Sequence, residues 1–339
     1  MSIYTVNGAE LSNAYGTNGS ELSNAYSGDG SIIFTKGSPQ YPISNVQSYF
    51  RARTQEVENQ IKALSSEWQS VVFVTDMHSW GNRQHSQAIA LYLLANTPVK
   101  CIILGGDFCF STWDESEYST YSSPLLQSGF LDDIYTLYGN HEIWGSGATD
   151  SAPKLYEDFL ESKSNISGNL QSIYYYFDDA DKKTRFVFVN TSDGSQYVMP
   201  NTQLEWLQSV VQLPDSTWSV IVFGHVNIDD LGGMTTDNEQ NGAAIATAIA
   251  SSNGSIIGYI CGHQHIDGIS TISGFHQATL YCDKLENTDY YPGYSVTDRE
   301  RDTIQEQAVS VISFNTTSKQ VVIRRIGVQS PNQTLAYSY

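Results

Sequence analysis

The chain has few of the residues that mark disulfide-rich, nucleic-acid-binding or membrane-spanning proteins. Four of its 339 residues are cysteine, and none stand in Cys-x-x-Cys spacing, which argues against a disulfide framework or a cysteine-type zinc site. Seventeen basic residues face 36 acidic ones, a formal charge of −19, so long nucleic acid would be repelled. No apolar run approaches the ~18 residues of a membrane span. We therefore expect neither long nucleic acid nor a membrane as partner.

The amino-terminal residues differ in composition from the rest of the chain. They lack the basic segment and apolar core of a secretory signal, which predicts a cytoplasmic location. The sequence ELSNAY at 10–15 recurs at 21–26, and Gly, Ser and Asn surround both copies. We predict an appendage over residues 1–40 and a single domain over residues 41–339. The appendage is either a flexible leader or an attachment segment, and the second case would make the protein virion-associated.

From residue 45 onward, helical and strand patterns alternate. Apolar residues make up 40% of the chain and aromatics 12%, enough for a large core. Helical spacing predicts helices over 45–66, 84–95, 202–211 and 242–251, and short apolar runs predict buried strands over 71–74, 101–104, 134–138, 220–223 and 256–261. Further strands are predicted over 174–177, 185–189, 269–272, 308–314 and 320–326. This order predicts a layered α/β sandwich, with its sheets inside and its helices outside.

Polar side chains come directly after five of the predicted strands. They are Asp76 and His78, Asp107, Asn140 and His141, His225, and His263 and His265. Ligands bind beyond the carboxyl ends of strands in α/β sheets, so we expect these side chains to converge. In Asp-x-His and His-x-His, alternation along an extended backbone would turn both side chains to one side. Glycines at 106, 139, 224 and 262 allow close approach of the backbone. Oxygen and imidazole ligands together suit Zn, Mn and Fe.

The motif series Asp-x-His, Gly-Asp, Gly-Asn-His-Glu, Gly-His and Gly-His-x-His resembles the calcineurin-like metallophosphoesterase superfamily over about residues 70–275. The resemblance implies a four-layer αββα sandwich of two mixed β-sheets flanked by helices. It also implies two divalent or trivalent metal ions, with Mn, Fe or Zn as the expected elements. By position in the motifs, the first ion is held by Asp76, His78 and His265, the second by Asn140, His225 and His263, and Asp107 bridges them.

The same resemblance makes His141 a catalytic residue that faces the substrate and is not a metal ligand, and Glu142 or another carboxylate would orient its ring. We hypothesise that a metal-bridging hydroxide attacks phosphorus and that His141 protonates the leaving oxygen as general acid. The segment after Asp107 lacks the arginine with which serine/threonine phosphatases grip phosphate. Arg83 is either a substrate-binding phosphate clamp or a solvated residue at the start of a helix.

These features predict a phosphoesterase that acts on phosphomonoesters or phosphodiesters of small molecules or polymers. Two alternatives stay open: a nuclease on short or single-stranded nucleic acid, and a virion-associated structural protein, as in phages, whose metal site is vestigial. Residues 174–176 are three consecutive tyrosines, which either line a groove for a sugar or base or pack within a strand. The sequence makes no prediction of the oligomeric state.

Overall fold

The computed structural model describes residues 24–26, 32–35, 41–79, 85–144, 148–192, 197–233, 238–283, 299–328 and 334–339. The chain divides into two compact units, Met1–Tyr41 and Pro42–Tyr339. In the first unit, β1 (Asn24–Tyr26) pairs antiparallel with β2 (Ile32–Thr35). The first copy of the ELSNAY repeat and Arg83 lie outside the described residues. All further elements belong to the second unit.

The second unit contains a six-stranded mixed sheet in the order β15-β14-β13-β3-β4-β5. Its parallel half is made of β3 (Trp68–Val74), β4 (Val99–Leu104) and β5 (Ile134–Thr136). Its antiparallel half is made of β13 (Ala308–Asn315), β14 (Gln320–Gly327) and β15 (Thr334–Ser338). The three parallel strands therefore end at the same edge of the sheet.

A seven-stranded mixed sheet lies in the order β11-β12-β10-β9-β8-β7-β6. Its parallel strands are β8 (Thr184–Phe188), β9 (Ser219–Phe223), β10 (Ser255–Cys261) and β12 (Phe275–Thr279). Antiparallel neighbours flank them: β6 (Ser167–Asn169), β7 (Tyr174–Asp179) and β11 (Gly268–Ile272). Both sheets are thus mixed, as expected.

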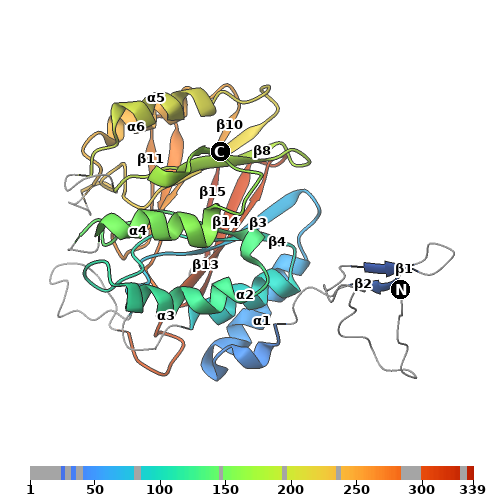
Figure 1. The fold of residues 1–339 in the computed structure, drawn as a ribbon. Helices are drawn as coiled ribbons and strands as arrows, with labels where there is room; N and C mark the ends of the chain where they lie inside the picture. Colours follow the sequence, from blue (N-terminus) through green and yellow to red (C-terminus); the bar gives the residue numbers. More distant parts are fainter. Residues whose placement is uncertain are drawn as a thin grey trace, which may run out of the picture. The chain divides into compact units, whose positions relative to one another are not determined.

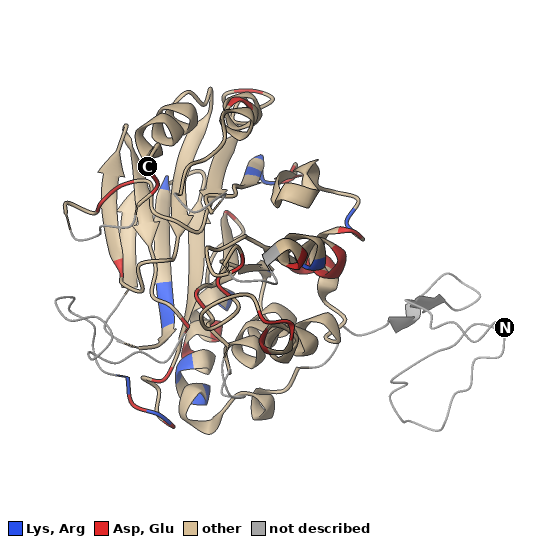
Figure 2. Ribbon diagram, turned by 60° about the vertical axis from the view of Figure 1, so that its left-hand side comes forward, with Lys and Arg blue, Asp and Glu red and all other residues tan. Residues whose placement is uncertain are grey.

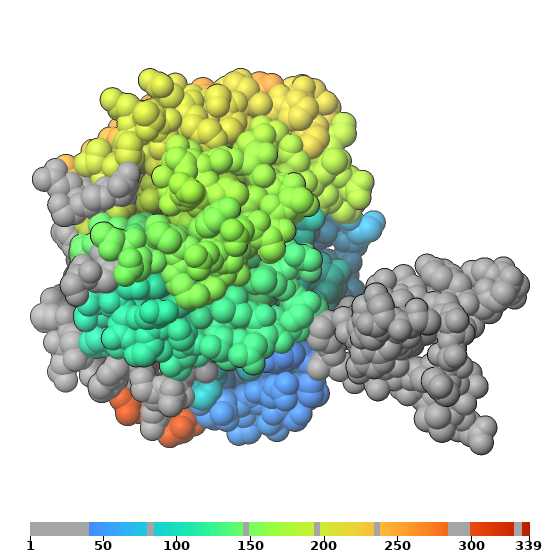
Figure 3. Space-filling model, in the orientation of Figure 1, coloured from blue at the N-terminus to red at the C-terminus, as the bar shows by residue number. Residues whose placement is uncertain are grey.

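Helices cover the outer face of each sheet, which gives the four-layer αββα sandwich that the family resemblance implies (Figure 1). The six-stranded sheet carries α1 (Ser48–Lys62), α2 (Ser86–Asn96) and α3 (Glu115–Leu126). The seven-stranded sheet carries α5 (Asn201–Val210) and α6 (Gly242–Ala250). A further helix, α4 (Ala148–Leu155), continues into a π-helical turn, η3 (Tyr156–Leu160). In Figure 3, the surface of the second unit has its first helices and strands (blue to teal) below and helices α5 and α6 (yellow) above.

None of the helices in the described ranges is long and apolar enough to cross a bilayer. Helix α2 is nevertheless buried on most sides, because Ile89, Leu91 and Leu93 all have no exposed surface. Helix α1 is amphipathic instead and buries Phe50, Val57 and Ile61. Burial of such side chains contributes about 1.5–3 kcal/mol each. Layering therefore follows from the apolar pattern of the helices and strands.

Aromatic rings fill the space between the two sheets. Tyr135 of β5 stacks on Phe177 of β7 with ring centroids 4.5 Å apart, and Phe73 of β3 stacks on Phe223 of β9 at 6.1 Å. Tyr175, the middle residue of the triple tyrosine, is fully buried in this layer. Its neighbours Tyr174 and Tyr176 pack on Trp206 and Arg185. Strand packing therefore accounts for the triple tyrosine.

The hydroxyl of Tyr175 joins the two sheets by hydrogen bonds to the edge strand β5. It donates to the carbonyl of Thr136 at 2.8 Å and accepts from the backbone N–H of Thr136 at 3.1 Å. Tyr175→Phe would leave two buried backbone groups without a partner, which costs about 1–3 kcal/mol. We expect a lower melting temperature in calorimetry. Tyr174→Phe is the matched control, because its hydroxyl makes one exposed 3.5 Å contact, and an equal loss in both variants would contradict the prediction.

Candidate metal centre

The carboxyl ends of five parallel strands, β3, β4 and β5 of one sheet and β9 and β10 of the other, bring the predicted ligands together. Three groups of side chains have ligand atoms within 4.8 Å of one another: Asp76, His78 and His265; His78, Asp107 and His141; and Asp107, His225 and His263. The Oδ1 atom of Asn140 lies 3.0 Å from Nε2 of His225. All eight residues singled out from the motifs therefore lie in one cluster, and Asp107 is common to two of its groups.

The backbone at this cluster is left-handed, where the sequence predicted an extended chain. The φ angles are 52° at Asp76, 43° at His78, 59° at Asp107, 68° at His263 and 54° at His265. This region is sparsely populated by residues other than glycine and costs of order 1–3 kcal/mol per residue. The expectation that alternation along an extended backbone turns the i and i+2 side chains inward is therefore wrong. They converge because tight left-handed turns follow the strands.

Two glycines make room for the carboxylates, as the sequence predicted. A Cβ atom at Gly139 would lie 2.2 Å from Oδ1 of Asp107, and one at Gly262 would lie 2.3 Å from Oδ2 of Asp76. Both distances are far below a van der Waals contact. Any larger residue at either position would displace a carboxylate from the cluster.

Backbone carbonyl groups orient two of the imidazoles. Nδ1 of His78 lies 3.1 Å from the carbonyl oxygen of Cys109, and Nδ1 of His225 lies 2.7 Å from that of Gly105. A ring nitrogen that faces a carbonyl oxygen must carry the proton, so each Nε2 is left to face the cluster. Such bonds fix the tautomer of metal-ligating histidines in many proteins.

When the imidazoles are neutral, the atoms that face one another across the cluster are hydrogen-bond acceptors. Nε2 of His78 lies 3.1 Å from Nε2 of His265, and Nε2 of His225 lies 3.2 Å from Oδ2 of Asp107. Lone pairs at these distances repel one another unless a proton or a metal cation lies between them. Carboxylate, amide and imidazole donors are also the ligand types that Zn, Mn and Fe accept. These residues therefore fit metal ions.

The protonation equilibria of the cluster reflect the same crowding. Burial alone would raise the pKa of Asp107, yet the imidazoles of His225 and His141 hold that pKa well below its ordinary value. Burial opposes charge on His225, but Asp107 and Asp76 raise its pKa to about 9. Burial and the neighbouring His225 lower the pKa of His263 to about 4. A proton on His225 thus occupies a nitrogen that a metal ion would need.

His141 lies at the exposed side of the cluster. Its side chain is 18% exposed, and Nε2 is 3.8 Å from Oδ2 of Asp107. Its Nδ1 is buried without a hydrogen-bond partner in the described part of the chain, so no carboxylate there orients the ring. Burial lowers the pKa of His141. Burial thus favours the neutral form of this imidazole.

Glu142 has a different task from the one expected. Its carboxylate accepts hydrogen bonds of 2.8 Å from three backbone N–H groups, those of Asp107, Phe108 and Gly139. It therefore ties the turn after β4 to the turn after β5 and does not orient the ring of His141. Three backbone donors thus occupy most of the acceptor positions of this buried carboxylate.

Three residues near the cluster escaped the sequence analysis. Cys282 is buried, hydrogen-bonds to His265 and accepts from Nη2 of Arg299 at 3.3 Å. Trp144 and Tyr197 contact His141 and His263 with their rings. No motif marks these positions, because they contact the histidines through tertiary packing.

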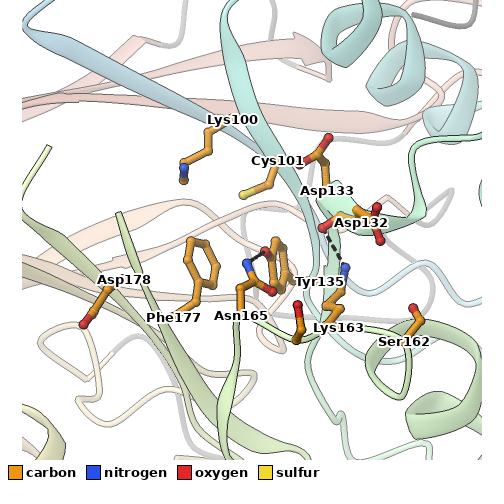
Figure 4. A pocket seen from close by; sticks show the side chains of 11 residues that line it. Lys100, Cys101, Asp132, Asp133, Tyr135, Ser162, Lys163, Asn165, Phe177 and Asp178 are labelled. Atoms are coloured by element: carbon orange, nitrogen blue, oxygen red, sulfur yellow. Dashed lines mark hydrogen bonds between the residues drawn. The ribbon is translucent and has the colours of Figure 1, made fainter. Parts of the chain in front are cut away.

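A separate cavity of about 350 Å³ opens at the amino ends of β4 and β5 (Figure 4). Its two lysines are already paired: Lys163 donates to the carbonyls of Leu131 and Asp132, and Lys100 forms an ion pair with Asp179. None of the predicted ligands lines it. The cavity is therefore distinct from the cluster, which lies at the opposite ends of these strands.

Comparison with known proteins agrees with this geometry. The model of the calcineurin-like phosphoesterase family matches residues 69–267. The chain belongs to this family. Among curated protein sequences, none matches the chain.

Solved structures share the family's fold with this chain. A dimetal phosphatase from Danio rerio is 17% identical, with a TM-score of 0.56 over 80% of this chain and 99% of that one. A purple acid phosphatase from yellow lupin (Lupinus luteus) is 13% identical, with a TM-score of 0.54 over 81% of this chain and 54% of that one. GAP50, the anchor in the inner membrane complex of Plasmodium, is 11% identical, with a TM-score of 0.53 over 80% and 88%.

Metal binding to this calcineurin-like phosphoesterase should release protons. His225 has its pKa raised to about 9, so at neutral pH a metal ion must displace its proton. We expect the affinity for Mn²⁺ to rise with pH up to about 9, by about tenfold per pH unit for each proton released. Calorimetric titrations in buffers of different ionisation enthalpy count the protons. An affinity that is flat between about pH 6 and about pH 8 would contradict the expectation.

Proposed function

We propose that this protein is a dinuclear metal-dependent phosphoesterase that hydrolyses phosphomonoesters or phosphodiesters. The observation that carries the proposal is the convergence of acceptor atoms from eight side chains at the ends of five strands. Every position that the family resemblance assigns to metal or substrate carries a side chain able to perform that role. This favours an enzyme over a structural protein with a vestigial centre.

The ligand sets follow the groups in the structure. Asp76, His78 and His265 would hold one ion, Asn140, His225 and His263 the other, and Asp107 would be shared. Bound divalent ions of this kind lower the pKa of water and offset negative charge on a phosphoryl group. The ligand side chains fix where the ions would lie, because their own positions are fixed. Backbone carbonyl groups orient His78 and His225, and Glu142 holds the turn that carries Asp107.

His141 is the general acid in this proposal. It is partly exposed beside the shared carboxylate of Asp107 and lies 3.8 Å from it. Burial lowers its pKa, but the negative charge of a bound phosphoester favours the protonated imidazole. His141 can then give a proton to the oxygen of the leaving group, a contribution of about 10²–10⁴-fold in rate.

The charge of the chain favours small substrates over long polyanions. Lys and Arg are few and fall on several different elements without a continuous stripe (Figure 2). A protein with a formal charge of −19 repels an extended nucleic acid outside a local positive site. A nuclease acting on short single strands remains the enzymatic alternative, and assays on oligonucleotides beside small phosphoesters distinguish the two.

The roles of Asp107 and His141 can be separated by mutation. Asp107→Asn should lower metal content, because Asp107 is common to two ligand groups, and turnover should fall with it. His141→Ala should keep the metal but slow hydrolysis by about 10²–10⁴-fold. Elemental analysis gives the metal content, and nitrophenyl phosphate and bis(nitrophenyl) phosphate report turnover of a monoester and a diester.

The control for both variants is His276→Ala. His276 is half-buried, bonds to Ser338 and Thr271 and is not among the candidate ligands, so this variant should retain metal and activity. Wild-type rates in both Asp107→Asn and His141→Ala would refute the proposed mechanism.

A further inference from the structure

Two large apolar side chains are exposed in the described part of the chain, and both belong to segments next to the metal centre. Trp144 is 38% exposed and Val198 is 36% exposed. Trp144 follows His141 by three residues, and Val198 directly follows Tyr197, whose ring contacts His263. Single exposed apolar residues are common, but a pair that coincides with the centre points to a ligand with an apolar part.

Trp144 contacts the general acid while its backbone is held in place. Its ring centroid is 4.9 Å from that of His141, with the ring planes inclined by 47°. Its carbonyl accepts a hydrogen bond of 3.2 Å from the N–H of Trp113, and Trp113 is itself buried against Tyr118. The exposed indole is therefore carried by an anchored backbone and keeps a free face for another ring.

Tyr197 has the corresponding position beside His263. Its ring lies edge-on to that imidazole at 5.2 Å. Its backbone is left-handed, with φ of 48°, and its carbonyl accepts from the N–H of Gln240 at 2.9 Å. Met199, two residues further, is tied to Asn241 by two hydrogen bonds. The segment is thus fixed with the ring of Tyr197 beside His263 and the exposed Val198 next to it in the chain.

These two aromatic residues contact different parts of the cluster. His141 belongs to the group with His78 and Asp107, and His263 to the group with Asp107 and His225. A phosphoryl group bound by ions that share Asp107 would therefore have two histidines near it, each in contact with an aromatic side chain. The organic group of the substrate extends from the phosphoryl oxygen that His141 protonates, so it would meet Trp144 first.

We propose that Trp144 binds the organic group of the substrate by ring stacking, with Tyr197 and Val198 bordering the site beyond His263. The substrate is then a small phosphoester whose leaving group carries a planar aromatic ring, either a simple aryl group or a nucleobase. This inference rests on the proposed function. It adds the chemical class of the leaving group and a residue that selects it.

The test compares phenylphosphonate with methylphosphonate on Mn²⁺-loaded protein by calorimetry. The two share a phosphonate head group, and their carbon–phosphorus bond resists hydrolysis. We expect the wild type to prefer phenylphosphonate by about tenfold, the effect of a good aromatic contact. Trp144→Ala should reduce the preference to about one without weakening methylphosphonate, and Trp144→Phe should restore most of it.

The control is Trp206→Phe, because Trp206 packs on Tyr174 on the outer face of the seven-stranded sheet. It should leave the preference unchanged. A second pair, adenosine monophosphate and ribose 5-phosphate, separates the two sources of the ring. A base-dependent gain that Trp144→Ala removes indicates a nucleobase, and a gain for phenylphosphonate alone indicates an aryl group.

The outcomes distinguish this inference from the proposed function. If the loaded protein binds neither phosphonate and hydrolyses no phosphoester, the proposed function fails and the inference fails with it. If it hydrolyses phosphoesters but binds phenyl and methyl compounds equally, or if Trp144→Ala keeps the preference, stacking on Trp144 is refuted and the proposed function stands.

Discussion

The molecule depends on holding acceptor atoms against one another at the ends of five strands. Buried acceptors are costly unless a proton or a cation lies between them, and here imidazole nitrogens, an amide oxygen and a carboxylate lie about 3 Å apart. The chain offsets this cost with rigid supports: carbonyl groups behind His78 and His225, and three backbone N–H groups on Glu142. The strained left-handed turns persist because these hydrogen bonds hold them in place.

The two sheets meet twice, and the two contacts differ in kind. Along their length, aromatic rings such as Phe73 and Phe223 pack face to face, and this apolar contact stabilises the fold without any ion. At the carboxyl ends of the strands, Asp107 of one sheet faces His225 of the other, and this contact is electrostatic. The apolar contact therefore positions the polar one, so the centre can exist as a shaped set of ligands before metal binds.

The sequence predicted the layers and the ligands better than it predicted the local backbone. Apolar runs followed by Asp, Asn or His located the centre, because strand burial and strand order leave a clear periodic pattern. Helix α3 was missed because Glu115–Leu126 is rich in serine and contains Pro124. The amino-terminal end of this helix could have been predicted, since Asp114 caps it and Glu117 stands at the third helical position. The left-handed turns and the hydrogen bonds of Glu142 could not be predicted from the sequence, because both depend on contacts between strand ends that are distant in the chain.

The acidic charge of the chain and the proposed binding of an anionic substrate are compatible because the two charges act over different distances. A charge of −19 is spread over the surface and screened beyond about 10 Å, whereas bound cations would create a positive focus within the cluster. Attraction at that focus is equal for all phosphoesters of one charge, so it cannot select among them. In the proposed function, selection therefore falls to uncharged side chains around the centre, and Trp144, exposed beside His141, offers an aromatic surface for it.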